Sequence, residues 1–215
     1  MQRQLEPELM EDPAQVLAYA QADFEIPHNS FIHHIKTLVG TTFNGVALDL
    51  GCGSGDICRR FARAYPHSLI HAVDGSKAML DYAESVEPSL PIQYIHGRLP
   101  DVILPQSSYD IIFSNSLLHH LPKPEILWQT VNCYAEKGTY IVMMDLFRPE
   151  SAGSAKELVT RYAGNEPEIL QHDFYHSLLA AFTKEEILAQ LAIAQLALQV
   201  TQISDRHLLM TGRIY

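Results

Sequence analysis

The sequence has 215 residues and a formal net charge of −10, from 15 Lys and Arg against 25 Asp and Glu. This length suits one domain, and a hydrophobic fraction of 47% is enough for a folded core. The acidic balance, with no basic stripe to offset it, disfavours a nucleic-acid substrate without excluding one. Three cysteines without CxxC spacing and the lack of a long apolar run indicate a cytoplasmic protein with no membrane contact.

Two helices are predicted before any strand. Residues 13–22 begin with Pro13 at a helix N-terminus, and a second helix is predicted from about residue 29 to 38. From residue 46, short apolar runs alternate with helical segments, which predicts βαβ units and a parallel sheet covered on both faces. The predicted strands are VALDL, LIHAVD, IQYIH, YDIIFSN and TYIVMMDLF, and the predicted helices between them are GDICRRFARAY, SKAMLDYAES and KPEILWQTVNCYA.

The C-terminal third predicts an insertion, a helix and a hairpin. Residues 148–182 are longer than a connection needs and have helical periodicity with a break at Gly164 and Asn165, so we expect a helical lid near the carboxyl ends of the strands. Thr183 and Glu186 form a capping box for the last helix. The runs LALQVTQIS and RHLLMTGRI are close enough in sequence to pair as an antiparallel hairpin.

These elements predict a single α/β domain. Its three layers would enclose a mostly parallel seven-stranded sheet with an antiparallel C-terminal hairpin strand. The parts are a helical cap in residues 1–40, a core in residues 46–145, the lid in residues 148–182, and the last helix and hairpin in residues 183–215.

The strongest motif is the glycine turn DLGCGSGD, from Asp49 to Asp56, after the first predicted strand. Gly51, Gly53 and Gly55 permit positive φ angles and let a ligand approach the backbone. A dinucleotide fingerprint has glycine where this loop has Asp56, whose carboxylate opposes a phosphate. The loop therefore favours a ligand with a positive centre and disfavours a nicotinamide oxidoreductase.

Asp74 ends the second predicted strand, 23 residues after Gly51, near the spacing of about 20 at which such folds bind ribose hydroxyls. It could also cap the next helix. A ribose-binding acid beside a glycine loop without phosphate chemistry suggests S-adenosylmethionine, whose sulfonium and amino groups are cations. With these motifs, residues 46–145 resemble a class I, Rossmann-like S-adenosylmethionine-dependent methyltransferase.

The resemblance implies that S-adenosylmethionine is the cofactor and that a methyl group passes to a small-molecule acceptor by in-line displacement. The loop GRLPD at 97–101 departs from many relatives, which have an acid directly after the glycine. The resemblance also implies which residues bind the cofactor. They are Asp49, Gly51, Cys52, Gly53 and Gly55 for the methionine end, Asp74, Gly75, Ser76 and Met79 for the ribose and adenosine, Gly97, Arg98 and Leu99 for the adenine, and Asn115 and Ser116 at the mouth of the site.

His119 and His120, which follow the fourth predicted strand, are the candidate catalytic residues. A histidine suits general-base work near neutral pH, although either one could instead bond backbone at the start of the next helix. Adjacent residues of a helical turn point about 100° apart, so we expect at most one to face the methyl group.

Five further residues are candidates for acceptor binding. Arg148 could hold a carboxylate or phosphate of the acceptor, or could instead pair with acids of the insertion. Aromatic residues of the lid could line the acceptor pocket or form the lid's own core. The candidates are Tyr19 and Asn29 in the N-terminal helices, Asp145 and Arg148 around the end of the fifth strand, and Tyr175 in the lid.

No metal is expected. His172 and His176 have i, i+4 spacing, but no third ligand follows from the sequence. Alternatives to a small-molecule methyltransferase are a non-catalytic or partner-dependent S-adenosylmethionine-binding subunit, an RNA or protein methyltransferase, and an enzyme that uses the cofactor without methylating an acceptor. The sequence specifies neither the acceptor nor the oligomeric state, for which a homodimer is one option.

Overall fold

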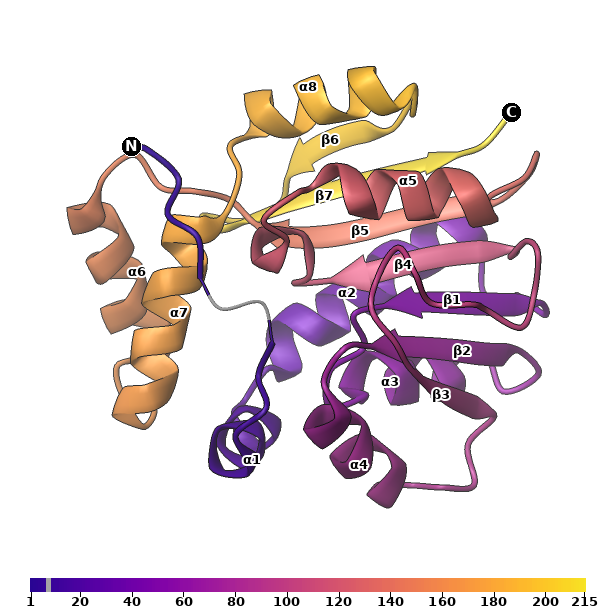
Figure 1. The fold of residues 1–215 in the computed structure, drawn as a ribbon, viewed down its shortest axis with the longest axis horizontal. Helices are drawn as coiled ribbons and strands as arrows, with labels where there is room; N and C mark the ends of the chain where they lie inside the picture. The colour runs from indigo at the N-terminus through magenta and orange to yellow at the C-terminus, as the bar shows by residue number, and fades with distance from the viewer. Residues whose placement is uncertain (7–8) are drawn as a thin grey trace.

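A computed structural model describes residues 1–6 and 9–215 of the chain. Its seven-stranded sheet has the order β3-β2-β1-β4-β5-β7-β6, in which neighbouring strands from β3 to β5 are parallel, while β7 is antiparallel to both β5 and β6 (Figure 1). The predicted fold class is therefore confirmed. The strands are β1 (Val46–Leu50), β2 (Leu69–Asp74), β3 (Ile92–His96), β4 (Ile111–Asn115), β5 (Tyr140–Leu146), β6 (Gln199–Gln202) and β7 (His207–Arg213).

Helices cover both faces of the sheet, as its buried apolar strands require. On one face, Phe31 of α2 and Phe61 of α3 pack on Phe113 of β4; on the other, Trp128 of α5 and Ile187 of α8 are fully buried. The helices are α1 (Pro13–Gln21), α2 (Glu25–Val39), α3 (Asp56–Ala64), α4 (Lys77–Ser85), the 3₁₀ turn η1 (Leu118–His120), α5 (Glu125–Tyr134), α6 (Ala152–Ala163), α7 (Glu168–Ala180) and α8 (Lys184–Ala194). No helix among the described residues is both long and apolar enough to cross a membrane.

Helix α2 begins at Glu25, earlier than the sequence predicts. The carboxylate of Asp23 accepts a hydrogen bond from the Glu25 N–H at 2.9 Å, which satisfies a donor at the start of the helix. Pro27 lies in the first turn, where its missing N–H has no partner within the helix. The spacing of apolar residues predicts only the part of the helix that packs on the core, and the exposed first turn carries no such pattern. The predicted helix therefore begins later than α2 does.

The carboxyl ends of the parallel strands meet at one edge of the sheet, and α1, α6 and α7 gather at this edge (Figure 1). Helices α6 and α7 bury a small core of their own, which includes Leu158, Leu178 and Leu179, with Phe174 and Tyr175 packed against it. The insertion is thus a folded helical pair beside the edge where open α/β sheets bind ligands.

The first residues of the chain cross the same edge. The Arg3 guanidinium donates to the carbonyl oxygens of His119 at 2.8 Å and Leu121 at 2.9 Å, and the Gln4 N–H donates to the Leu179 carbonyl at 3.0 Å. Arg3 also lies over the ring of Phe182, 3.9 Å from its centroid. These contacts join the N-terminal segment to both η1 and α7, an arrangement that sequence spacing does not predict.

Candidate active site

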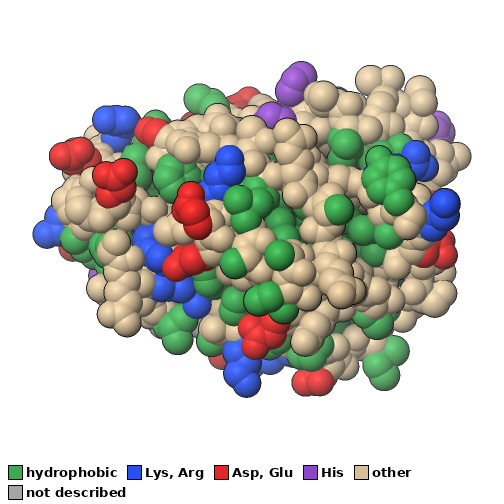
Figure 2. Space-filling model, turned by 90° about the horizontal axis from the view of Figure 1, so that it is seen from above, with side chains coloured by type: hydrophobic (Ala, Val, Ile, Leu, Met, Phe, Trp, Pro, Cys, Tyr) green, Lys and Arg blue, Asp and Glu red, His purple; other side chains and the backbone are tan. Residues whose placement is uncertain are grey.

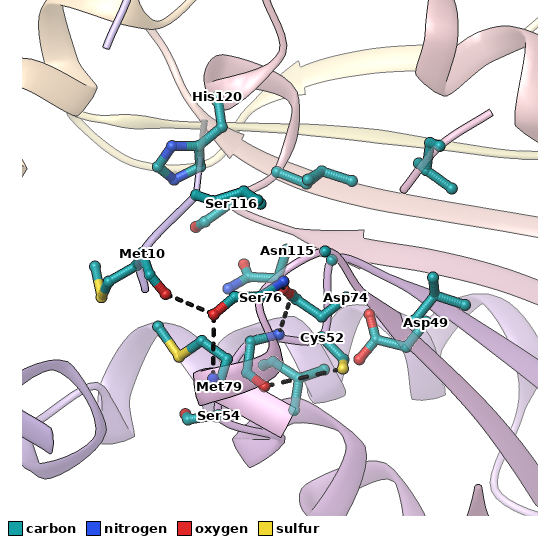
Figure 3. A pocket seen from close by; sticks show the side chains of 18 of the residues that line it. Met10, Asp49, Cys52, Ser54, Asp74, Ser76, Met79, Asn115, Ser116 and His120 are labelled. Carbon is teal, nitrogen blue, oxygen red and sulfur yellow. Dashed lines mark hydrogen bonds between the residues drawn. The ribbon is translucent and has the colours of Figure 1, made fainter. Parts of the chain in front are cut away.

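A pocket opens at the carboxyl edge of the sheet (Figure 3). The loops after β1, β2, β3 and β4 form its walls, and the N-terminal segment and helices α1 and α2 contribute the rest. The lining residues predicted from the sequence are Asp49, Gly51, Cys52, Gly53, Asp74, Gly75, Ser76, Met79, Gly97, Arg98, Leu99, Asn115, Ser116, His120 and Tyr19. The residues that the sequence analysis does not assign to a binding site include Leu9, Met10, Ser54, Ile57, Val73, Leu117 and Leu121.

The glycine loop turns sharply because its three glycines, Gly51, Gly53 and Gly55, take left-handed backbone angles. Gly53 has φ +52°, and a Cβ added there would meet nothing within 4 Å, so the backbone is open to a ligand. Gly55 has φ +78° and precedes the first residue of α3, where an added Cβ would lie 2.5 Å from the Tyr94 hydroxyl. The loop therefore requires glycine for both its conformation and its close contacts.

Asp74 connects two loops of the pocket. Its Oδ2 accepts a hydrogen bond from the Gly53 N–H at 2.7 Å, and its Oδ1 accepts one from the Ser76 N–H at 2.8 Å. Burial raises the pKa of Asp74, although these backbone donors partly offset the effect. Ser76 caps α4 through the Met79 N–H and donates to the Met10 carbonyl at 2.5 Å, which attaches the N-terminal segment to the rim (Figure 3).

Asp49 lies at the end of β1 and is 1% exposed. The Cys58 thiol of α3 donates to its Oδ2 at 2.8 Å. Burial raises the pKa of Asp49 to about 7, even though the hydrogen bond from Cys58 lowers it. A cation placed beside this carboxyl would favour its ionised form, because an opposite charge lowers the pKa of an acid. The partner thiol is not predictable from sequence, since it depends on how α3 packs on β1.

Asp56, the acid in place of a fingerprint glycine, contacts one side chain of α2 and one of its own helix, α3. Its Oδ2 lies 2.7 Å from His28 Nδ1 and 2.7 Å from Arg60 Nε. Burial raises the pKa of Asp56, but the hydrogen bonds from His28 and Arg60 outweigh burial and hold that pKa well below its ordinary value. Asp56 therefore fastens α2 to the start of α3 and keeps a negative charge at the pocket rim.

Tyr19 of α1 lies on the side of the pocket covered by the N-terminal helices. Its ring packs on Phe24 with centroids 4.9 Å apart, and Phe24 stacks on His28 at 5.2 Å. Burial raises the pKa of Tyr19 to about 12, with smaller contributions from Asp56 and other carboxylates. The hydroxyl is therefore neutral at physiological pH.

The two histidines after β4 occupy different positions. His120 lines the pocket, whereas His119 is 3% exposed and its Nδ1 lies 2.5 Å from Asp145 Oδ1. Asp145 also accepts a hydrogen bond from the Leu118 N–H at 2.7 Å. The ring centroids of His119 and His120 lie 4.2 Å apart, and the Glu6 carboxylate lies near both rings. Burial lowers the pKa of His119, but the Asp145 and Glu6 carboxylates outweigh burial and raise it above its ordinary value.

Four residues predicted to bind the acceptor are engaged elsewhere and do not line this pocket. The Asn29 side chain accepts from Arg60 at 2.6 Å, and Asp145 holds η1 as described. The Arg148 guanidinium donates to the Ala181 carbonyl at 2.9 Å and to Glu186 at 2.6 Å. Tyr175 packs in the core of α6 and α7. Gly55 also lies outside the lining and shapes the loop instead.

The strand order, the glycine loop after β1 and the acid after β2 define a class I, Rossmann-like methyltransferase fold. Residues 47–138 match a family model described as a methyltransferase domain. The solved structure of a SAM-dependent methyltransferase from Aquifex aeolicus superimposes with a TM-score of 0.70 at 17% identity, covering 96% of this chain and all of that one, which shows a shared fold.

Two curated relatives match parts of the chain. A malonyl-[acyl-carrier protein] O-methyltransferase from Halalkalibacterium halodurans is 38% identical over 81 residues, which is 36% of this chain and 30% of that protein. A demethylmenaquinone methyltransferase from Chlamydia pneumoniae is 29% identical over 104 residues, which is 47% of this chain and 45% of that protein. The matches thus span less than half the length of either relative.

Proposed function

We propose that this protein is an S-adenosylmethionine-dependent methyltransferase that acts on a small molecule. The observation that supports this most strongly is that Asp49 and Asp56 of the glycine loop and Asp74 at the end of β2 line one pocket, and that all three lie in the region that matches a methyltransferase domain. Such a rim suits a cationic cofactor and opposes a pyrophosphate. The names of the two relatives point to different acceptors, so the similarity does not select one acceptor.

The residues of the pocket fit S-adenosylmethionine. Gly53 leaves its backbone accessible, and Asp74 lies at the end of β2 where a ribose would reach it. The Asn115 Oδ1 is buried and has no hydrogen-bond partner among the described residues, so a donor of the cofactor or acceptor would satisfy it. When bound, the cofactor supplies a methyl group on a sulfonium, which is already a good leaving group.

The chain's own residues would then position the acceptor. Methyl transfer is an in-line displacement, in which a bond forms from the acceptor atom to the methyl carbon while the carbon–sulfur bond breaks. His120 lines the pocket beside Ser116, so in this proposal it is the histidine that would orient the acceptor or take its proton (Figure 3). His119 would act through its contacts with Asp145 and Glu6 rather than on the acceptor directly.

A small acceptor is supported by the segments around the pocket. Residues 1–6 contact both η1 and α7, and Gln15 of α1 donates to Asp173 of α7 at 2.6 Å, so the N-terminal segment, α1 and α7 are joined at this edge. On the face shown in Figure 2, Lys and Arg lie among acidic side chains rather than in a continuous stripe, which suits a substrate other than RNA. The three cysteines are free, in keeping with the cytoplasmic location that we also propose.

Two measurements, made one after the other, test this proposal. Calorimetry with S-adenosylhomocysteine tests cofactor binding, and we expect one site per chain. Turnover of S-adenosylmethionine with a panel of thiol, hydroxyl, amine and carboxylate acceptors then tests catalysis. Binding without turnover of any acceptor would favour the non-catalytic subunit, methylation of added RNA or protein would favour a macromolecular substrate, and the absence of binding would refute the cofactor assignment.

A further inference from the structure

The Glu6 side chain, from the N-terminal segment, meets the adjacent histidines His119 and His120 beside the pocket. Glu6 Oε1 lies 3.2 Å from His120 Nδ1 and 3.6 Å from His119 Nε2, and one ligand atom from each of the three residues lies within 4.8 Å of the others. Ligand atoms about 2.0–2.1 Å from a tetrahedral zinc ion are about 3.3 Å from one another. The two distances from Glu6 are therefore close to those of a metal site.

Only one of the two oxygens of the Glu6 carboxylate accepts a hydrogen bond from the described residues. Its side chain is 6% exposed, and its Oε2 accepts a hydrogen bond from the Ser177 hydroxyl at 3.1 Å. Its Oε1 is buried and makes no hydrogen bond with the described residues. A buried carboxylate oxygen without a donor is costly, and a cation between this oxygen and the two imidazoles would remove that cost.

Asp145 prepares His119 as a ligand. His119 Nδ1 lies 2.5 Å from the Asp145 carboxylate. Because an ionised carboxylate can only accept, the N–H at Nδ1 donates to Asp145, and the lone pair is then on Nε2, the ring nitrogen that faces Glu6. The Asp145 carboxylate is itself held by the Leu118 N–H. A carboxylate that orients a histidine in this way is the usual outer partner of a metal-bound imidazole.

We propose that Glu6, His119 and His120 bind a divalent transition-metal ion, Zn²⁺ in the first instance, at the acceptor side of the pocket. Two histidines and one carboxylate are a donor set that zinc takes when a fourth position stays open for a substrate. His120 lines the pocket, so the open position would face the space where the acceptor enters. The sequence predicts no such site because Glu6 is near the N-terminus, far along the chain from the histidines.

The role of this ion in catalysis rests on the proposed function. A thiol or hydroxyl acceptor would be bound by the ion and would lose its proton to solvent at a lower pH than in water. The acceptor atom would then form a bond to the methyl carbon as the carbon–sulfur bond breaks, which yields S-adenosylhomocysteine, the methylated acceptor and one released proton. The two histidines would thus act on the acceptor through the ion.

The test measures metal binding by the full-length protein after treatment with a chelator. Zn²⁺ is titrated by calorimetry, and Co²⁺ is titrated by visible absorption, which reports tetrahedral coordination. We expect one equivalent of each ion and at least about tenfold weaker binding in Glu6→Gln and in His120→Ala. The matched control is the double variant His172→Ala, His176→Ala, which removes a histidine pair on α7 whose ring centroids lie 4.3 Å apart. This control should keep the one-equivalent site.

S-adenosylhomocysteine binding is measured on the same samples. Retained binding by Glu6→Gln shows that the variant is folded, so its loss of metal can be assigned to the ligand. The proposal is overturned if the wild-type protein binds no stoichiometric metal, or if the α7 double variant loses the ion while Glu6→Gln retains it. If the wild-type protein binds S-adenosylhomocysteine normally but no metal, only the metal site is refuted. If it binds metal but no S-adenosylhomocysteine, the proposed function is refuted.

Discussion

Asp74 accepts a hydrogen bond from the backbone N–H of Gly53 at 2.7 Å, and this contact ties the end of β2 to the glycine loop after β1. The same carboxylate accepts from the Ser76 N–H, so one side chain sets the positions of two loops that line the pocket. Because ribose hydroxyls would bind at this acid, Asp74 is expected to contribute both to the shape of the pocket and to the affinity of the cofactor.

Asp74→Ala should weaken S-adenosylmethionine binding by more than about tenfold and lower the free energy of unfolding by about 1–3 kcal/mol, since two backbone donors lose their acceptor. Calorimetry and urea denaturation measure the two effects. The control is Asp110→Ala, which removes an acceptor of the Val46 N–H at the opposite end of β1 and should leave cofactor affinity unchanged. An unchanged dissociation constant in Asp74→Ala would contradict the assignment.

Asp49 makes stability depend on pH. Burial raises its pKa from an ordinary value of 3.8 to about 7, so between about pH 4 and 7 the folded state binds more protons than the unfolded state. The contribution of Asp49 therefore lowers the free energy of unfolding as pH rises through this window, on the order of a few kcal/mol. Urea denaturation across the window measures this slope. It should be flatter in Asp49→Asn than in the wild type, and identical slopes would show that Asp49 titrates normally.

Tyr19→Ala should weaken binding of S-adenosylmethionine about tenfold and binding of S-adenosylhomocysteine less, because only the former has a sulfonium that an aromatic face attracts. Tyr19→Phe keeps the ring and should bind both ligands nearly as the wild type does. Calorimetry with both ligands measures the difference. Leu17→Ala, an exposed position on the same helix, is the control. Equal weakening of both ligands by Tyr19→Ala would indicate a packing role only.

Arg148→Met should lower the free energy of unfolding by about 1–3 kcal/mol, because the Ala181 carbonyl and Glu186 lose a buried donor. Thermal and urea denaturation measure the loss. Arg161→Met, an exposed arginine paired with Asp205, should change the midpoint little. Normal stability together with a raised KM for the acceptor would instead favour the interpretation, made from sequence, that Arg148 binds an acceptor anion.

The order of the elements and the cofactor side of the pocket follow from local sequence patterns. The alternation of apolar strands with helices predicts the sheet, and the Thr183–Glu186 capping box is present at the start of α8 as predicted. The sequence predicts Gly53 and Asp74 as pocket residues for two reasons. A tight turn after a strand needs glycine at fixed positions, and the acid at the end of the next strand follows the turn at a characteristic spacing. Such features depend on neighbours in the chain, so the sequence by itself determined them.

The contacts at the proposed acceptor side were decided only by the tertiary structure. Glu6 meets His119 because Arg3 and Gln4 attach the N-terminal segment to η1 and α7, a packing choice that leaves no periodic trace in the sequence. The hydrogen bond from Arg148 to Glu186 is likewise a contact between distant segments, because it depends on where α8 packs. Contacts between distant segments arise from the way in which helices fill space, whereas strand and turn patterns arise from backbone geometry within a few residues.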